Sequence, residues 1–162
     1  MLEIFEKRGD RTVITEQIKS DIIYVCALIE HIGRATHNRN QTIAKIIGVD
    51  GIAWQLKHAQ TSHCLTFDET SEEVIEEYEI PQGSFDSVKN CTGHVPLPIH
   101  VARTYKSLIV NIAENSETPL AEIIYDVFTS FISDEISNFN TSTFYENPSY
   151  IYHSYLEGEL LD

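Results

Sequence analysis

The sequence predicts a mainly α-helical protein, a single domain over residues 1–162 built as a bundle of three long and several short helices. Apolar residues recur at three- and four-residue steps along much of the chain, the spacing of one helix face. Residues that cap helices stand directly before prolines at 118–119 and 147–148. The 162 residues, 42% hydrophobic and 22% charged, suffice for one core, and no Gly/Ser-rich or Pro-rich linker divides them.

The first half is expected to contain one long helix between shorter elements. The opening segment, Leu2–Ile14, suits a small N-terminal hairpin. A central helix follows from Thr15, whose side chain can cap it, and Gly33 lies near its end. Two short helices are then expected at Gln41–Ile47 and Gly51–His58.

The second half is expected to contain four more helices. Apolar spacing and capping residues predict them over Ser71–Tyr78, Ile99–Asn115, Leu120–Phe139 and Ser149–Glu157. Thr70 and Glu73 fit a capping box before the first of these. Thr118 is the expected cap of the third, with Pro119 at its first helical position.

Charge is divided unevenly along the chain. Residues 1–60 hold eight Lys and Arg against seven Asp and Glu, whereas residues 61–162 hold three against eighteen. A field of this sign repels nucleic acid and anionic membranes and attracts basic protein surfaces. No apolar run is long enough to cross a bilayer. We therefore expect a basic protein partner, with neither nucleic acid nor a membrane favoured.

The cysteines and the first residues bear on location. Cys26, Cys64 and Cys91 are an odd number without a close pair, which argues against a disulfide framework and for a reducing compartment. The first twenty residues carry several charges and no apolar signal segment. We expect a cytoplasmic protein of bacterial or phage type that uses no cofactor.

Two segments are candidates for binding the basic partner. On a helix, Glu72 lies four residues from Glu76, and Glu73 four from Glu77, so like charges adjoin at a cost of about a few tenths of a kcal/mol per pair. A fold that tolerates this suggests a use for the field; the alternative is an ordinary solvated helix face. Tyrosines, stiff and amphipathic, form the second candidate, or alternatively a lid over the core. These tyrosines are Tyr150, Tyr152 and Tyr155.

Nucleic-acid binding is an alternative that rests on a resemblance. The stretch Gln41–Val49 resembles the first helix and turn of a helix-turn-helix, with Gly48 at the turn. The resemblance implies phosphate contacts from basic side chains nearby, for which Arg39, Lys45 and Lys57 are available. The segment after the turn offers few side chains that read base edges, so a helical hairpin buried in the core explains the same residues.

Catalysis is a further alternative. Arg34 and His37, separated by two residues, resemble the arginine and histidine pair of helical ribonucleases of the HEPN type, which have a longer gap. The resemblance implies that the arginine binds phosphate and the histidine acts as general acid and base, with Glu30 close by on the same helix. A solvated helix end, with both side chains near the carboxyl-terminal dipole, explains the residues equally well. Motifs of common hydrolases, nucleotide-binding proteins and zinc proteases are absent from the sequence.

A zinc site is the last alternative. His63, Cys64, Cys91 and His94 make up the two thiols and two imidazoles of a Cys₂His₂ set. Adjacent residues such as His63 and Cys64 point apart in regular structure, and small buried cysteines with surface histidines explain the pattern without metal.

Taken together, the charge distribution and the absence of catalytic motifs predict an acidic protein-binding module, an antitoxin or immunity-type inhibitor covering a basic surface, rather than an enzyme. The alternatives are a helix-turn-helix-like nucleic-acid-binding protein and a small nuclease-like enzyme using Arg34 and His37.

Overall fold

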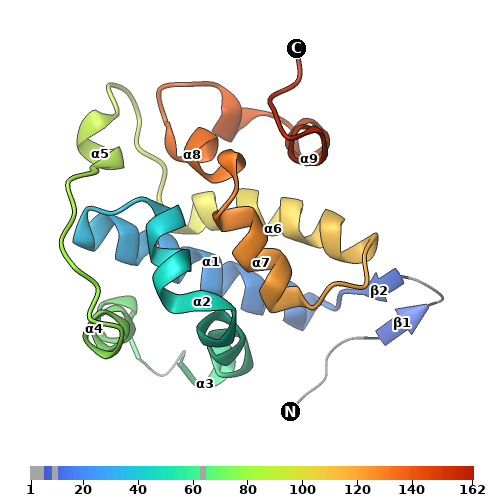
Figure 1. Ribbon diagram of the computed structural model, residues 1–162, viewed down its shortest axis with the longest axis horizontal. Helices are drawn as coiled ribbons and strands as arrows, with labels where there is room; N and C mark the ends of the chain where they lie inside the picture. Colours follow the sequence, from blue (N-terminus) through green and yellow to red (C-terminus); the bar gives the residue numbers. More distant parts are fainter. Residues whose placement is uncertain (1–5, 9–10, 63–64) are drawn as a thin grey trace.

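A computed structural model describes residues 6–8, 11–62 and 65–162 and confirms the mainly helical bundle (Figure 1). The elements are β1 (Glu6–Arg8), β2 (Arg11–Val13), α1 (Glu16–Thr36), α2 (Asn40–Lys57), α3 (Ala59–Ser62), α4 (Phe67–Glu77), α5 (Ser87–Asn90), α6 (Pro98–Glu114), α7 (Leu120–Phe128), α8 (Phe131–Ser137), the 3₁₀ turn η1 (Thr143–Tyr145) and α9 (Pro148–Glu157).

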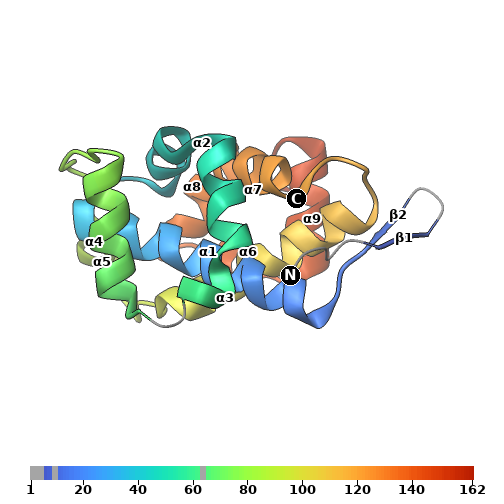
Figure 2. The ribbon, with the colours of Figure 1, turned by 90° about the horizontal axis from the view of Figure 1, so that it is seen from below.

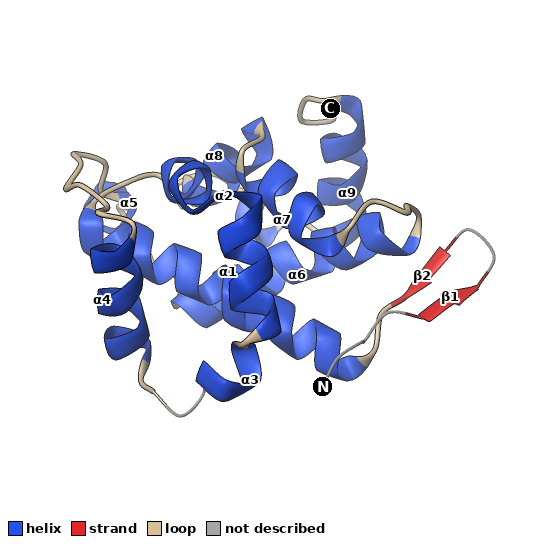
Figure 3. Cartoon of the chain, turned by 60° about the horizontal axis from the view of Figure 1, so that its bottom comes forward, coloured by secondary structure: helices blue, strands red, loops and turns tan. Residues whose placement is uncertain are grey.

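The expected N-terminal hairpin is present. β1 and β2 pair antiparallel with Glu6 opposite Val13, and Figure 3 shows them in red, extending away from the helices. The remaining residues of the expected segment, 2–5 and 9–10, lie outside the described residues. Ile14, directly after β2, is buried and joins the hairpin to the hydrophobic core.

α1 is the central helix because its apolar residues cover most of its circumference. Thr15 caps it as expected, its hydroxyl accepting a hydrogen bond from Ile18 N at 3.2 Å. The helix packs chiefly against α6 and α2, while α2 in turn packs against α7 and α6 against α9. It runs past Gly33 to Thr36 and ends at His37, whose φ of 58° places it in the left-handed region.

α2 combines the two short helices expected from the sequence. They meet at Gly48, where φ is 76° and ψ is 171°, so the helix is interrupted as the turn residues predict. Ile43 and Ile47 before the break and Ile52 after it are buried. Both halves therefore contribute to one core.

Two predicted caps are wrong by a few residues. The capping box of α4 is made by Thr66 and Glu69, one turn before the predicted Thr70. Thr70 is instead buried, because its side chain faces α1 within the helix. At α7 the N-cap is Pro119 rather than Thr118, so no side chain accepts a capping hydrogen bond at the start of this helix.

The predicted helix Leu120–Phe139 is also wrong, since two helices, α7 and α8, replace it. The chain leaves the helix at Thr129, and the Ser130 hydroxyl caps α8 by accepting a hydrogen bond from Ile132 N at 3.3 Å. The side-chain amide of Gln41, from α2, donates to the carbonyl oxygen of Thr129 at 3.1 Å. A contact from a distant segment thus satisfies backbone at the break.

Within residues 6–8, 11–62 and 65–162, no helix has both the length and the apolar character needed to cross a bilayer. Figure 2 shows α4 at one end of the molecule and α9 toward the other, a separation that Figures 1 and 3 repeat.

Candidate functional site

The carboxyl-terminal part of α1 holds a buried ion pair. Arg34 Nε donates to Glu30 Oε2 at 2.7 Å, and the side chains are 17% and 2% exposed. The second carboxylate oxygen of Glu30 accepts a hydrogen bond from Asn40 Nδ2 at 2.7 Å. Arg34 Nη2 donates to the Pro96 carbonyl at 2.7 Å. Because a buried charge is stable only when paired and hydrogen-bonded, this arrangement ties α1 to α2 and to the loop before α6.

His37, the third residue of the catalytic alternative, faces another neighbour. Its Nε2 lies 3.6 Å from Asp86 Oδ2, and its backbone carbonyl accepts a hydrogen bond from Phe85 N at 2.9 Å. The structure therefore brings Glu30 and Arg34 together and directs the His37 ring to the segment before α5.

Close approach at the end of α1 depends on Gly33. A Cβ at this position would lie 2.7 Å from Asn40 Oδ1 and 3.0 Å from Asn38 O. The glycine thus lets the turn after α1 fold back onto the helix, which places the Asn40 amide on Glu30.

Two other ionisable groups lie in the core. Burial raises the pKa of the Cys26 thiol, so that it stays protonated and unreactive at neutral pH. Burial likewise raises the pKa of Tyr105, although a hydrogen bond between its hydroxyl and Ser133 Oγ, at 3.0 Å, acts in the opposite direction. Both groups are therefore uncharged at neutral pH and pack within the hydrophobic core.

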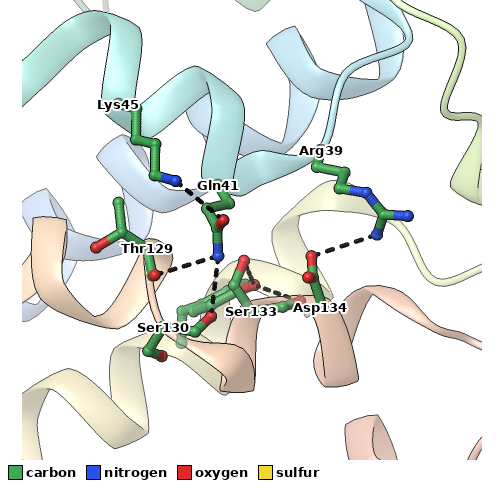
Figure 4. A network of polar contacts seen from close by, with 8 residues as sticks. Arg39, Gln41, Lys45, Thr129, Ser130, Ser133 and Asp134 are labelled. Carbon is green, nitrogen blue, oxygen red and sulfur yellow. Dashed lines mark hydrogen bonds and ion pairs between the residues drawn. The ribbon is translucent and has the colours of Figure 1, made fainter.

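Two of the three basic residues of the nucleic-acid alternative, Arg39 and Lys45, contact other side chains of the protein. Arg39 Nη1 lies 3.4 Å from Asp134 Oδ1, and Lys45 Nζ donates to Gln41 Oε1 at 3.2 Å; both contacts are drawn in Figure 4. Lys57 lies in the last turn of α2. In the same half of α2, Gln55 is buried, so this amide does not face outward as a base-reading side chain would.

A cleft of about 450 Å³ opens between the start of α2, the α5 segment and α8. Arg39 at its edge places its guanidinium 4.3 Å from the centre of the Phe85 ring. Residues lining the cleft include Arg39, Phe85, Cys91, Asp134, Glu135 and Phe139. Of these, the sequence predicts a functional role only for Arg39 and Cys91. The others lacked a local signal because the cleft forms from segments far apart in sequence.

The zinc alternative is only partly described. His63 and Cys64 lie outside the described residues. Cys91 is half-buried and its Sγ lies 3.5 Å from the carbonyl oxygen of His94, a contact with the backbone rather than the imidazole. Among residues that the structure does describe, no three or more His, Cys, Asp or Glu gather as a metal site requires.

The acidic helix α4 is held by one narrow face. Its Phe67 ring stacks on Tyr24 of α1 with centroids 5.3 Å apart, and Asp68 Oδ1 lies 3.1 Å from His31 Nε2. Val74 is buried on the same side. The opposite side is solvent-exposed and carries Glu72, Glu73, Glu76 and Glu77.

The tyrosines of α9 are half-buried and pack against the hydrophobic core. Tyr150 donates a hydrogen bond from its hydroxyl to the Leu161 carbonyl at 2.8 Å, which folds the last residues back onto α9. Burial, followed by the nearby charge of Asp126, raises the pKa of Tyr155. Since α9 and α4 lie far apart in all three ribbon views, the tyrosines and the glutamates do not form one continuous surface.

Comparisons with protein-family models, with curated proteins and with solved structures return no match to this chain. The chain's own geometry is therefore the basis for assigning its function.

Proposed function

We propose that this chain is an acidic protein-binding module, of the antitoxin or immunity-inhibitor type, which covers a basic surface of another protein. One observation carries the proposal. The four glutamates on the outer side of α4 are exposed, and within the described part of the chain no Lys, Arg or His forms an ion pair with them. These are Glu72, Glu73, Glu76 and Glu77.

The exposed glutamates of α4 destabilise the helix and at the same time attract a basic partner. At i,i+4 spacing the two pairs, Glu72 with Glu76 and Glu73 with Glu77, destabilise the helix by about a few tenths of a kcal/mol each. The same charges steer a basic partner and raise its association rate by about 10–10³-fold at low ionic strength. The arrangement favours binding at the expense of helix stability.

The interior supports binding over catalysis. The Arg34 guanidinium already donates to Glu30 and to the Pro96 carbonyl, so phosphate would have to compete with two short hydrogen bonds. The Cys26 thiol is buried and protonated. Cys26 and Cys91 are both free thiols, which is compatible with a cytoplasmic protein.

Co-purification with the products of neighbouring genes, at low and at moderate ionic strength, tests the proposal. We expect one basic protein to be retained and its affinity to fall as salt is raised, because the attraction is electrostatic. Failure to retain any protein at either ionic strength would count against the module.

A matched pair of variants locates the interface. The first replaces the four α4 glutamates with Gln. The second removes the same charge from exposed residues elsewhere: Glu122→Gln, Glu157→Gln, Glu159→Gln and Asp162→Asn. We expect the first to abolish retention and the second to preserve it. The reverse result would move the interface to the C-terminal segment beside the α9 tyrosines.

A further inference from the structure

The cleft between α2, α5 and α8 has a composition suited to a cation. Its lining residues include two with acidic side chains, Asp134 and Glu135, and one with a basic side chain, Arg39. Asp134 and Arg39 lie 3.4 Å apart and balance each other's charge. Glu135 is half-buried, and its carboxylate has neither a hydrogen bond nor an ion pair within the described residues. The cleft therefore retains one uncompensated negative charge.

Both aromatic rings that line the cleft already bind an arginine of this chain on one face. The Arg39 guanidinium lies 4.3 Å from the centre of the Phe85 ring. The Arg34 guanidinium, which belongs to α1, lies over the Phe139 ring, 5.5 Å from its centre. A planar guanidinium stacks on aromatic rings and pairs with a carboxylate in two parallel hydrogen bonds, which an ammonium does not.

Hydrogen bonds preform the walls of the cleft. The Asn140 side chain donates to the Asn90 carbonyl at 2.8 Å and accepts from Thr92 N at 2.9 Å. These contacts fix the segment after α5 against the segment after α8. A site held open in this way binds without first ordering its own backbone.

We infer that this cleft is a guanidinium site, in which Glu135 pairs with an arginine side chain of the partner. The inference rests on the proposed function, since it names the group by which a basic partner is anchored. The volume of about 450 Å³ falls within the roughly 300–1,000 Å³ of ligand pockets. The exposed glutamates of α4 supply long-range attraction, while the cleft supplies a specific contact.

Cys91 provides a reporter because it lines the cleft and is half-buried, whereas Cys26 is fully buried. In a chain carrying Cys64→Ser, the rate of Cys91 alkylation by iodoacetamide is measured as N-acetyl-arginine-methylamide is added. We expect saturable slowing of alkylation. The citrulline analogue, which has nearly the same shape but no charge, is expected to protect roughly tenfold less well, the loss typical of a charge-assisted hydrogen bond.

Glu135→Gln tests the carboxylate, with Glu122→Gln on the exposed side of α7 as the control. We expect the first to weaken protection by the arginine analogue roughly tenfold and the second to leave it unchanged. Equal protection by the arginine and citrulline analogues, unchanged protection in Glu135→Gln, or no protection at any concentration would each overturn the inference.

The assay separates this inference from the proposed function because it needs no partner protein. Replacement of the four α4 glutamates leaves arginine protection intact if the cleft acts as inferred. Partner retention that persists in Glu135→Gln, with arginine protection lost, overturns the anchoring role and leaves the module standing. Arginine protection without any retained partner has the opposite meaning, since the guanidinium site survives and the proposed module fails.

Discussion

Arg34 and Glu30 form an ion pair within the protein, with Nε and Oε2 2.7 Å apart. The two residues are four positions apart on α1 and therefore lie on the same face of the helix. The other oxygen of the Glu30 carboxylate accepts a hydrogen bond from the side chain of Asn40, at the start of α2. The pair thus connects two helices at the point where the chain turns, and its loss leaves a buried charge without compensation.

Replacement of Arg34 by alanine is expected to lower the free energy of unfolding by about 3–5 kcal/mol, because Glu30 would remain buried and unpaired. Urea denaturation measures this change. Arg103→Ala, which removes an exposed arginine from α6, should change stability by about 0.5 kcal/mol or less. An Arg34→Ala protein as stable as Arg103→Ala would mean that the buried pair is not structural.

The break in α2 depends on glycine at position 48. With φ of 76° and ψ of 171°, Gly48 occupies a region that is essentially closed to residues with a Cβ, although nothing lies within 4 Å of where a Cβ would stand. We expect Gly48→Ala to lower the free energy of unfolding by about 1–3 kcal/mol through backbone strain alone.

Gly93→Ala is the matched control for that change. A Cβ at Gly93 also meets nothing within 4 Å, and this glycine does not have a positive φ. Its replacement should be neutral or should stabilise by about 0.4–1 kcal/mol, because alanine restricts the unfolded chain. Equal thermal midpoints for the two variants would contradict the role assigned to Gly48.

The sequence predicts both ends of α6 and α9 to within one residue, and it also predicts the start of α1. All three helices have a regular apolar stripe, and α1 and α9 also begin with capping residues. Thr15 and Asn147 cap α1 and α9 as expected. The break between α7 and α8 has no such signal, since apolar spacing continues through Thr129 and Ser130. The side chain of Gln41, 88 residues before Thr129, helps to satisfy the freed backbone. Single-sequence periodicity does not contain that contact.

The two candidate sites also differ in how far the sequence predicts them. The exposed carboxylates of α4 follow from charge and helical spacing within one short segment, so the sequence predicts them directly. The cleft requires Phe85, Glu135 and Phe139 to meet across separate segments, which depends on tertiary packing. The sequence gives each of these residues only its local role, as an apolar or charged position.

Stability is expected to decline at alkaline pH because of Tyr105 and Cys26. Burial holds their pKa values above the ordinary 10.0 and 9.0, so the folded protein retains these protons after the unfolded chain has lost them. The stability present below those values is then lost as pH rises, by about 1.4 kcal/mol per pH unit for each group. Tyr105→Phe should flatten the decline above about pH 10.

The measurement is the free energy of unfolding by urea across this pH range, with each variant referred to its own value near neutral pH. Tyr145→Phe, which removes an exposed hydroxyl, is the control. A Tyr105→Phe slope equal to that of the unmodified chain would show that the buried phenol does not govern alkaline unfolding.

Replacing Glu76 and Glu77 with lysine separates the effect on helix stability from the effect on binding. Both glutamates lie in the last turn of α4, which contains no basic residue. Glu76→Lys with Glu77→Lys converts two like-charge pairs into opposite-charge pairs and places cations at the negative end of the helix dipole. We expect the free energy of unfolding to rise by about 0.5–1 kcal/mol while affinity for a basic partner falls steeply.

The control is Glu157→Lys with Glu159→Lys, which makes the same change in total charge and should retain the partner. A variant that unfolds also loses binding. Loss of binding by a variant that is more stable than the original protein is therefore due to the changed charges and not to unfolding. Retained binding by the α4 double variant would exclude this face as the interface.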